Sequence, residues 1–416
     1  MSAGNIDIWV YADWIGLKGP KCVGVLTAQQ AKGKKAFSFE YDRNWLLLPE
    51  KLLLDPDIQW FPGKQYPSGK ENFGVIMDSM PDTWGRTLLR RKASHQAILE
   101  GRPIPTLYEI DYLLGVYDEG RMGALRFKTD PEGPFLDNNP HFPTPPWTKV
   151  KELQYGAKEL EMSDDISATN QWLDLLIAPG SSLGGARPKA NILDDKGHPW
   201  IAKFPSKNDS FDKAAWEYLA YCLANKSGIN MAPCKIDSIS GPYHTFFTKR
   251  FDRNGSERIH FSSAMTMTGY IEEMLKDRFA SYLDIAEFIQ FSCGHVKENL
   301  HQIWRRIVFN IAISNTDDHL RNHGFIIRDN SWILSPAFDL NPSVDKTGLA
   351  LNIDMDNNTL DFEIARSVGE YFQLTKKEME LIIDEVISAV GDWRQVAKNM
   401  SINKHEIEYM ERAFRV

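Results

Sequence analysis

The stretch Asn315-Thr316-Asp317-Asp318-His319-Leu320-Arg321-Asn322 combines acids, amides and a histidine directly after an apolar segment. An acid, Asp317, precedes the amide Asn322 by five residues, and a further acid, Asp339, follows roughly two dozen residues on. Phosphoryl transfer from a nucleotide needs one carboxylate that orients the acceptor hydroxyl, with an amide and a second carboxylate that hold Mg²⁺ against the phosphates. The segment therefore predicts phosphoryl transfer from ATP, with Asn322 and Asp339 as the magnesium ligands.

The same segment has two other interpretations. An Asp-rich loop that merely caps a helix is common, and the neighbouring acids Asp317 and Asp318 would repel one another without a compensating cation or basic group. His319 and His323 are four residues apart, as in zinc-binding helices. However, Leu320 stands where the glutamate of the H-E-x-x-H motif would be, which argues against zinc.

A glycine-rich stretch, Ser181 to Lys189, lies far upstream. Gly184 and Gly185 would let backbone amides approach phosphate oxygens without a side-chain clash. The stretch lacks the Gly-Lys-Ser/Thr end of a P-loop and the G-x-G-x-x-G of protein kinases. An ordinary turn is therefore the alternative interpretation, and Lys189 would then lie in solvent.

Lys203 follows apolar residues on a predicted strand, and Glu217 lies on the helix that follows it. An ammonium group away from water needs an anionic partner, which ATP phosphates would supply. Glu217 could hold Lys203 in place, as a helix glutamate does in kinases. A solvent-facing lysine and an unrelated surface glutamate are the alternative.

The composition is that of an ordinary globular protein. The 416 residues are 43% hydrophobic and 25% charged, enough for two or three domains. A net charge of −8 argues against an extended nucleic-acid surface. The four cysteines are scattered, which favours a reducing cytoplasm, and no apolar run approaches the ~20 residues of a membrane helix. We therefore expect a cytoplasmic protein without a membrane partner.

The pattern along the chain changes from strands to helices. Strands are expected at 6–11, 35–41, 189–193, 199–204 and 245–251, with 194–197 as a hairpin turn. Helices are expected at 86–99, from a cap at Ser210 through 223, at 285–291 and 300–313, and from a capping box at Thr375 through 390. Six prolines between Pro131 and Pro146 indicate an extended connector and a domain boundary.

Taken together, these motifs resemble the HipA family of serine/threonine kinases, the toxins of bacterial toxin–antitoxin pairs. The resemblance covers almost the whole chain, from Met80–Arg86 to Asp339. It implies an α+β, protein-kinase-like bilobed fold with a β-rich N-terminal subdomain and a mostly helical C-terminal lobe. The expected parts are an N-terminal subdomain at 1–130, a connector at 131–148, a small lobe at 149–253 and a large lobe at 254–416.

The resemblance also implies a role for each matching residue. Asp317 would be the catalytic base, while Asn322 and Asp339 would bind magnesium and, with His319, the nucleotide. Other nucleotide contacts are implied in the glycine-rich loop, the lysine strand and the hinge: Gly184, Gly185, Ala186, Arg187, Pro188, Lys189, Lys203, Lys249, Arg250 and Phe251. Family members autophosphorylate a loop serine, which corresponds to Ser182, with Ser181 beside it. We expect this phosphate to repel ATP and switch the enzyme off.

Two departures from the family pattern are visible. Arg187-Pro188 stands where some of these toxins carry Gln-Glu, and Asp318 follows the catalytic acid where other residues occur. The implied partners are a helix-turn-helix antitoxin of the HipB type, operator DNA reached through that antitoxin, and a protein substrate such as an aminoacyl-tRNA synthetase. Phosphorylation of that substrate would arrest growth and give persistence. A non-toxic kinase of the same fold and a catalytically inactive binding module are the alternatives.

Overall fold

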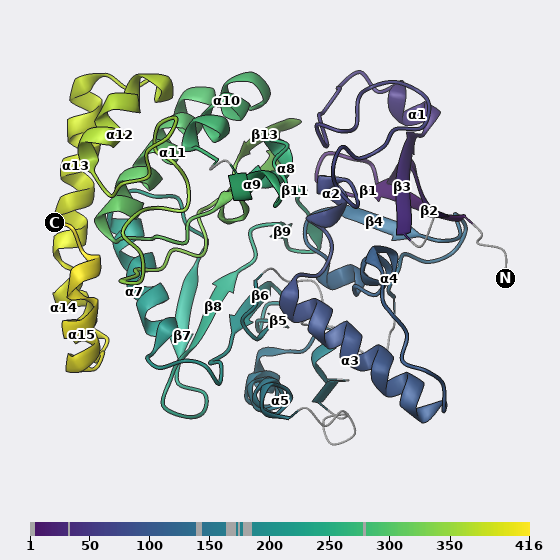
Figure 1. Cartoon of the computed structure of the whole chain (residues 1–416), viewed down its shortest axis with the longest axis horizontal. Helices are drawn as coiled ribbons and strands as arrows, with labels where there is room; N and C mark the ends of the chain where they lie inside the picture. The colour runs from purple at the N-terminus through teal and green to yellow at the C-terminus, as the bar shows by residue number, and fades with distance from the viewer. Residues whose placement is uncertain are drawn as a thin grey trace. The chain divides into compact units, whose positions relative to one another are not determined.

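The chain is strand-rich toward its N-terminus and helical toward its C-terminus (Figure 1). The computed structural model describes residues 5–31, 34–138, 144–163, 172–173, 175–177, 185–277 and 280–416. These form two compact units. Unit 1 comprises Met1–Asp209, Ser238–Gly241 and Phe247–Ser262, and unit 2 comprises Ser210–Asp237, Pro242–Phe246 and Ser263–Val416.

Unit 1 begins with an antiparallel sheet in the strand order β3-β2-β1-β4. The strands are β1 (Ile6–Ala12), β2 (Lys21–Ala31), β3 (Lys34–Tyr41) and β4 (Leu125–Lys128). Ile8, Val10 and Ala12 bury one face of β1, with the period of two that a half-buried strand requires. The strands predicted at β1 and β3 are confirmed. The strand β2, which lies between them in the sequence, was not predicted.

Several helices follow the first three strands. The predicted helix is α3 (Thr83–Leu99), and it begins where the carboxylate of Asp82 accepts a hydrogen bond from the backbone N–H of Gly85. The shorter elements are α1 (Arg43–Leu46), α2 (Gly74–Met77), α4 (Glu109–Leu114) and the 3₁₀ turn η1 (Asp118–Gly120).

Both described ends of the proline-rich connector are hydrogen-bonded into unit 1. The N–H of Leu136 donates to the carbonyl of Phe127 on β4, and the N–H of Leu193 donates to the carbonyl of Pro145. The turn η2 (Trp147–Lys149) and the helix α5 (Val150–Met162) come next. The connector thus lies inside unit 1, and the four-part division of the chain remains a prediction.

The predicted hairpin is present as β5 (Lys189–Leu193) and β6 (Pro199–Lys203), which pair antiparallel. Gly197 closes its turn with a φ of 78°, a conformation that glycine adopts without strain. The predicted strand at 245–251 is the shorter β8 (Thr245–Lys249), next to β6. The remaining short strands are β7 (Cys234–Asp237), β9 (Arg253–Asn254), β10 (Glu257–Arg258) and β11 (Phe261–Ser263).

In unit 2, α11 (Val296–Ala312) is the central helix. It contacts α10 (Tyr282–Ser292), α12 (Phe362–Val368) and α13 (Lys376–Gly391), and its Ile303, Trp304 and Ile307 are fully buried (Figure 1). The predicted capping box at Thr375 is confirmed. The other elements are α7 (Lys213–Lys226), α8 (Ala264–Met267), α9 (Met274–Asp277), η3 (Leu320–Asn322), β12 (Gly324–Arg328), β13 (Ser331–Leu334), η4 (Gly369–Phe372), α14 (Trp393–Asn399), α15 (Lys404–Met410) and η5 (Glu411–Ala413).

One predicted cap is wrong. The helix α7 begins at Asp212, whose carboxylate accepts from the N–H of Ala215, and Ser210 is exposed two residues earlier. Asp212 also accepts from the ring and the backbone N–H of His244, so tertiary contacts decide which residue caps the helix. Within the described ranges, none of the helices combines the length and apolar character needed to cross a membrane.

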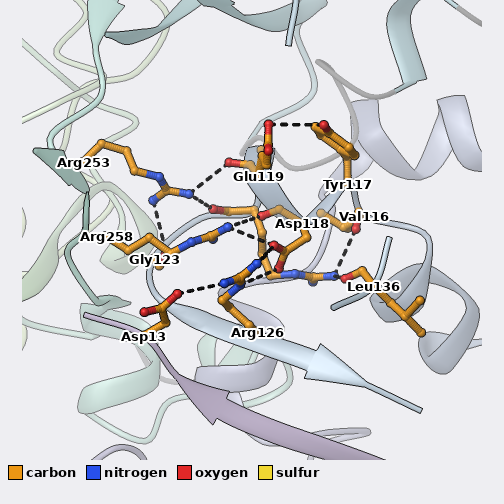
Figure 2. A network of polar contacts seen from close by, with 12 residues as sticks. Asp13, Val116, Tyr117, Asp118, Glu119, Gly123, Arg126, Leu136, Arg253 and Arg258 are labelled. Atoms are coloured by element: carbon orange, nitrogen blue, oxygen red, sulfur yellow. Dashed lines mark hydrogen bonds and ion pairs between the residues drawn. The ribbon is translucent and has the colours of Figure 1, made fainter. Parts of the chain in front are cut away.

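A buried network of arginines and aspartates ties the N-terminal sheet to the segment after β8 within unit 1 (Figure 2). Arg126 on β4 pairs with Asp118 at 2.5 Å and with Asp13 at 2.9 Å. Arg258 on β10 reaches the same Asp118 at 3.1 Å. Several donors thus satisfy one carboxylate, as a buried charge requires.

Asp252 is the second centre of this network and is fully buried. Its carboxylate pairs with Arg250 at 2.6 Å and Arg253 at 2.7 Å, and it accepts from the N–H of Gly123 at 2.8 Å. Burial alone would raise the pKa of Asp252, but the two guanidinium groups outweigh burial and hold the pKa well below its usual range.

We expect the substitution Asp252→Ala to destabilise the protein by about 3–5 kcal/mol, because it leaves two buried guanidinium groups without their carboxylate. Urea unfolding checks this. Asp392→Ala is the control, since Asp392 is 62% exposed and pairs with Lys226 at the surface, where an ion pair contributes at most about 1 kcal/mol. Equal unfolding midpoints for the two variants would contradict the structural role of Asp252.

Candidate active site

The loop after α11 carries the acids singled out in the sequence. Ser314 adopts the left-handed conformation, with a φ of 49°, directly after the last turn of α11. Its carbonyl accepts from the N–H groups of Thr316 and Ser343. The side-chain amide of Asn315 donates to Asn310 Oδ1 on α11 at 3.1 Å. The helix end therefore fixes where the loop begins.

Asp318 is the anchor of this loop. Its carboxylate is 1% exposed, and one oxygen, Oδ2, accepts three hydrogen bonds. The donors are the hydroxyl of Tyr282 at 2.5 Å, the amide of Asn310 at 2.8 Å and Nε2 of His323 at 2.7 Å. Burial raises the pKa of Tyr282 well above its ordinary value, so this hydroxyl keeps its proton. These three donors stabilise the carboxylate of Asp318 and so offset the repulsion expected between Asp317 and Asp318.

Asp317, unlike its neighbour Asp318, is exposed to solvent. Its side chain is 78% exposed, and Oδ1 is 3.5 Å from Nζ of Lys346. An exposed pair of this kind is weak and leaves the carboxylate accessible. The loop therefore holds one acid in the protein interior and presents the other to solvent. His319 is also exposed, whereas His323 is buried against Asp318, so the histidines do not share a site.

The two predicted magnesium ligands lie on segments that hydrogen bonds connect. The Nδ2 of Asn322 donates to the carbonyl of Asp317 at 3.2 Å, which orients its oxygen away from that carbonyl. Asn341 donates through Nδ2 to Asp339 and through its backbone N–H to Oδ1 of Asn315. Asp339 adopts a φ of 61°, a conformation that costs a non-glycine residue about 1–3 kcal/mol and that is concentrated at functional sites. The oxygens of Asn322 and Asp339 fit the ligand chemistry of Mg²⁺.

Two lysines of unit 1 lie on the strands that directly follow the glycine-rich stretch. Lys189 on β5 and Lys203 on β6 are direct cross-strand partners. Side chains directly opposite in an antiparallel pair share one face with Cβ atoms about 4.5–5.5 Å apart, and like charges there are destabilising. Lys189 is also 5% exposed. The two ammonium groups give this face of the hairpin a concentration of positive charge.

Gly185 is the described part of the loop next to these lysines. Its φ is 85°, and a Cβ atom built on it would lie 2.8 Å from Nζ of Lys189. A larger residue would therefore push the ammonium group aside. Gly184, Ser181 and Ser182 lie outside the described residues. Ala186 is exposed and Pro188 is buried.

Sequence reasoning missed two residues of this region, Asp82 and Trp84. The indole N–H of Trp84 donates to the carbonyl of Lys189 at 3.0 Å, and Oδ2 of Asp82 is 3.9 Å from Nζ of Lys189. Burial raises the pKa of Asp82 to about 6, although Lys189 acts in the opposite direction. No local sequence pattern indicates this contact, because the two segments are 105 residues apart.

Other predicted residues have clear structural surroundings. Arg187 forms a two-pronged ion pair with Asp209, at 2.9 and 2.6 Å. The guanidinium of Arg250 lies in the buried network of unit 1, so contact with a nucleotide through this side chain is not favoured. Lys249 and Phe251 are half-buried, and their predicted backbone contacts with adenine remain predictions. Glu217 is buried on α7 in unit 2, and its pairing with Lys203 also remains a prediction.

Comparison with known proteins defines the family. Residues 181–394 match the family described as HipA-like C-terminal domain, which is just over half of the chain, and the chain belongs to this family. The HipA chain from Shewanella oneidensis MR-1, solved in a complex of HipA, HipB and operator DNA, superposes with a TM-score of 0.65. That match has 17% sequence identity and covers 98% of this chain and 94% of the other. The predicted α+β, protein-kinase-like fold is confirmed.

Two further relatives were found. A curated Haemophilus influenzae protein named "Putative kinase" is 27% identical over 180 residues, which are 38% of this chain and 52% of that protein. The chain thus spans about half the length of this curated relative. The Helicobacter pylori proinflammatory kinase CtkA matches with a TM-score of 0.34 and 14% identity, covering 51% of this chain and 95% of the other.

We expect Asp318→Asn to destabilise the protein by about 1–3 kcal/mol, because an amide cannot accept all three buried hydrogen bonds. Tyr282→Phe removes one donor and should cost about 1 kcal/mol. Thermal unfolding with hydrogen exchange at residues 315–323 checks both. Tyr371→Phe is the control, since Tyr371 is 62% exposed. Unchanged exchange in Asp318→Asn would show that this carboxylate does not anchor the loop.

Proposed function

We propose that this chain is an ATP- and Mg²⁺-dependent serine/threonine protein kinase and the toxin of a toxin–antitoxin pair. The observation that carries the proposal is the cross-strand pair Lys189–Lys203 beside Gly185, which is suited to the phosphates of a nucleotide. The exposed carboxylate of Asp317, fixed by its buried neighbour Asp318, supplies the complementary chemistry in unit 2.

In the proposed reaction, the acceptor hydroxyl oxygen forms a bond to the γ-phosphorus of ATP as the bond from that phosphorus to the β–γ bridging oxygen breaks. Asp317 orients the hydroxyl and takes its proton, and ADP leaves. Lys203 and Lys189 bind the phosphates. Asn322 and Asp339 would hold Mg²⁺, whose charge offsets that of the transferred group.

Purified protein with labelled ATP and Mg²⁺ tests this directly. Asp317→Ala should lower the rate of label transfer by about 10²–10⁴, because a general base contributes that much. We expect comparable losses for Asp339→Ala and Lys203→Ala. Asp392→Ala is a control, since it removes an exposed aspartate that also pairs with a lysine. Undiminished transfer by Asp317→Ala would refute the assignment of the base.

The toxin role is supported by the relative solved with HipB and operator DNA. We propose that this chain binds a helix-turn-helix antitoxin of the HipB type and contacts DNA only through it. A net charge of −8 is in keeping with such indirect contact. The proposed substrate is a serine of a translation enzyme such as an aminoacyl-tRNA synthetase. Growth arrest on induction of the wild type but not of Asp317→Ala distinguishes a toxin from a non-toxic kinase. Label transfer itself argues against an inactive module.

We further propose autophosphorylation of Ser182 or Ser181 as the off-switch. A phosphate adds a charge of about −1.5 to −2 beside the site for ATP phosphates and would repel them. During incubation with ATP, the wild type should lose activity while Ser181→Ala/Ser182→Ala retains it. Ser210→Ala, at an exposed serine, is the control. Inactivation of the double variant at the wild-type rate rules out this switch.

A further inference from the structure

A pocket of about 560 Å³ lies in unit 2 beside the loop that carries Asp317. Its apolar lining includes Leu320, Leu349 and Leu351, all of them buried. His319 and Lys346 are exposed and also line it. The pocket thus has a mixed polar and apolar lining, with the lysine Lys346 next to the predicted catalytic residue.

Hydrogen bonds hold the walls of this pocket in place. Leu349 donates through its N–H to the carbonyl of Asn358 at 2.8 Å and accepts from the side-chain amide of the same residue at 2.7 Å. The N–H of Asn352 donates to the carbonyl of Ala280 at 2.9 Å. A pocket braced on both sides by such bonds is largely formed before a ligand arrives.

The charge of the lining is one-sided. Lys346 bears a positive charge, while no carboxylate appears among the described lining residues. This contrasts with the net charge of −8 of the whole chain. Lys346 is 60% exposed, and its Nζ lies 3.5 Å from Asp317 Oδ1, so one residue belongs both to the pocket and to the surroundings of the base.

We infer that this pocket binds the acceptor, as a peptide segment with an acidic side chain next to the residue that is phosphorylated. The inference rests on the proposed kinase function, which it extends to a class of substrate. Lys346 would release Asp317 and pair with the acidic side chain, while a neighbouring side chain of the peptide enters the pocket.

The distances within an extended peptide favour this arrangement. An acceptor hydroxyl must approach Asp317 to about 2.6–3.2 Å for proton transfer. Neighbouring residues of an extended segment follow at about 3.3–3.6 Å each. The side chains that flank the acceptor therefore fall within reach of a flexible lysine that already touches the base. Because the acceptor displaces Lys346 from Asp317, the carboxylate is freed as the substrate binds.

The test measures binding of a fluorescent heptapeptide with a central serine flanked on each side by two glutamates. Its uncharged counterpart carries glutamine at the same positions. By fluorescence anisotropy, the full-length wild type should bind the glutamate peptide about fivefold more tightly, and added salt should reduce the difference. Lys346→Glu should abolish or reverse this preference.

Lys297→Glu is the matched control. Lys297 is 59% exposed and lies 3.6 Å from Glu378 in the same unit, much as Lys346 is placed beside Asp317. It should keep the wild-type preference. Equal affinity of the wild type for both peptides overturns the inference, as does an equal loss in the two lysine variants. Competitive displacement of the peptide by ATP also overturns it, because Lys346 would then belong to the nucleotide site.

Binding and phosphoryl transfer are measured separately, so the two proposals can fail independently. Peptide preference without label transfer to any acceptor would contradict the kinase and leave an acidic-peptide site. Label transfer without a preference for the glutamate peptide would support the kinase and refute the acceptor site proposed here.

Discussion

The hydrogen bonds to the buried carboxylate of Asp318 are the interaction that fixes the loop after α11 in unit 2. A charge in the protein interior is tolerated only when donors surround it. Here Tyr282 on α10, Asn310 on α11 and His323, the residue before β12, provide them. Because all three donors belong to the packed body of the unit, the loop has one position that satisfies the charge. The position of Asp317 follows from that of its neighbour.

In unit 1 the corresponding feature is the positive charge of two lysines on one hairpin. Lys189 and Lys203 are cross-strand partners on β5 and β6, and Oδ2 of Asp82 lies 3.9 Å from Nζ of Lys189. An anion bound there, as in the proposed kinase, would offset the repulsion between the two ammonium groups. The ion pairs around Asp118 and Asp252 connect the segment after β8 to the N-terminal sheet of unit 1.

Sequence analysis found the elements whose signals are local. The hairpin turn at Gly197 and the capping box at Thr375 depend on residues a few positions apart, and both were predicted correctly. The short motifs from Met80–Arg86 to Asp339, taken together in their order, suggested the family. Features created by contacts between distant residues were missed. The indole of Trp84 meets a carbonyl 105 positions away, and Lys346 approaches Asp317 from a separate segment. The cap of α7 is Asp212 and not the predicted Ser210. Its carboxylate also accepts a hydrogen bond from the ring of His244, a residue 32 positions away.

The hydrogen bond between Trp84 and the carbonyl of Lys189 has a thermodynamic consequence for regulation. It joins α3 directly to β5, the strand that carries Lys189, which we propose binds the phosphates. Any protein that binds α3 and displaces it must alter the free energy of nucleotide binding. By linkage, the nucleotide then alters the affinity for that protein by the same factor. The presence or absence of ATP would thus be communicated to a surface remote from the chemistry, with no further domain required.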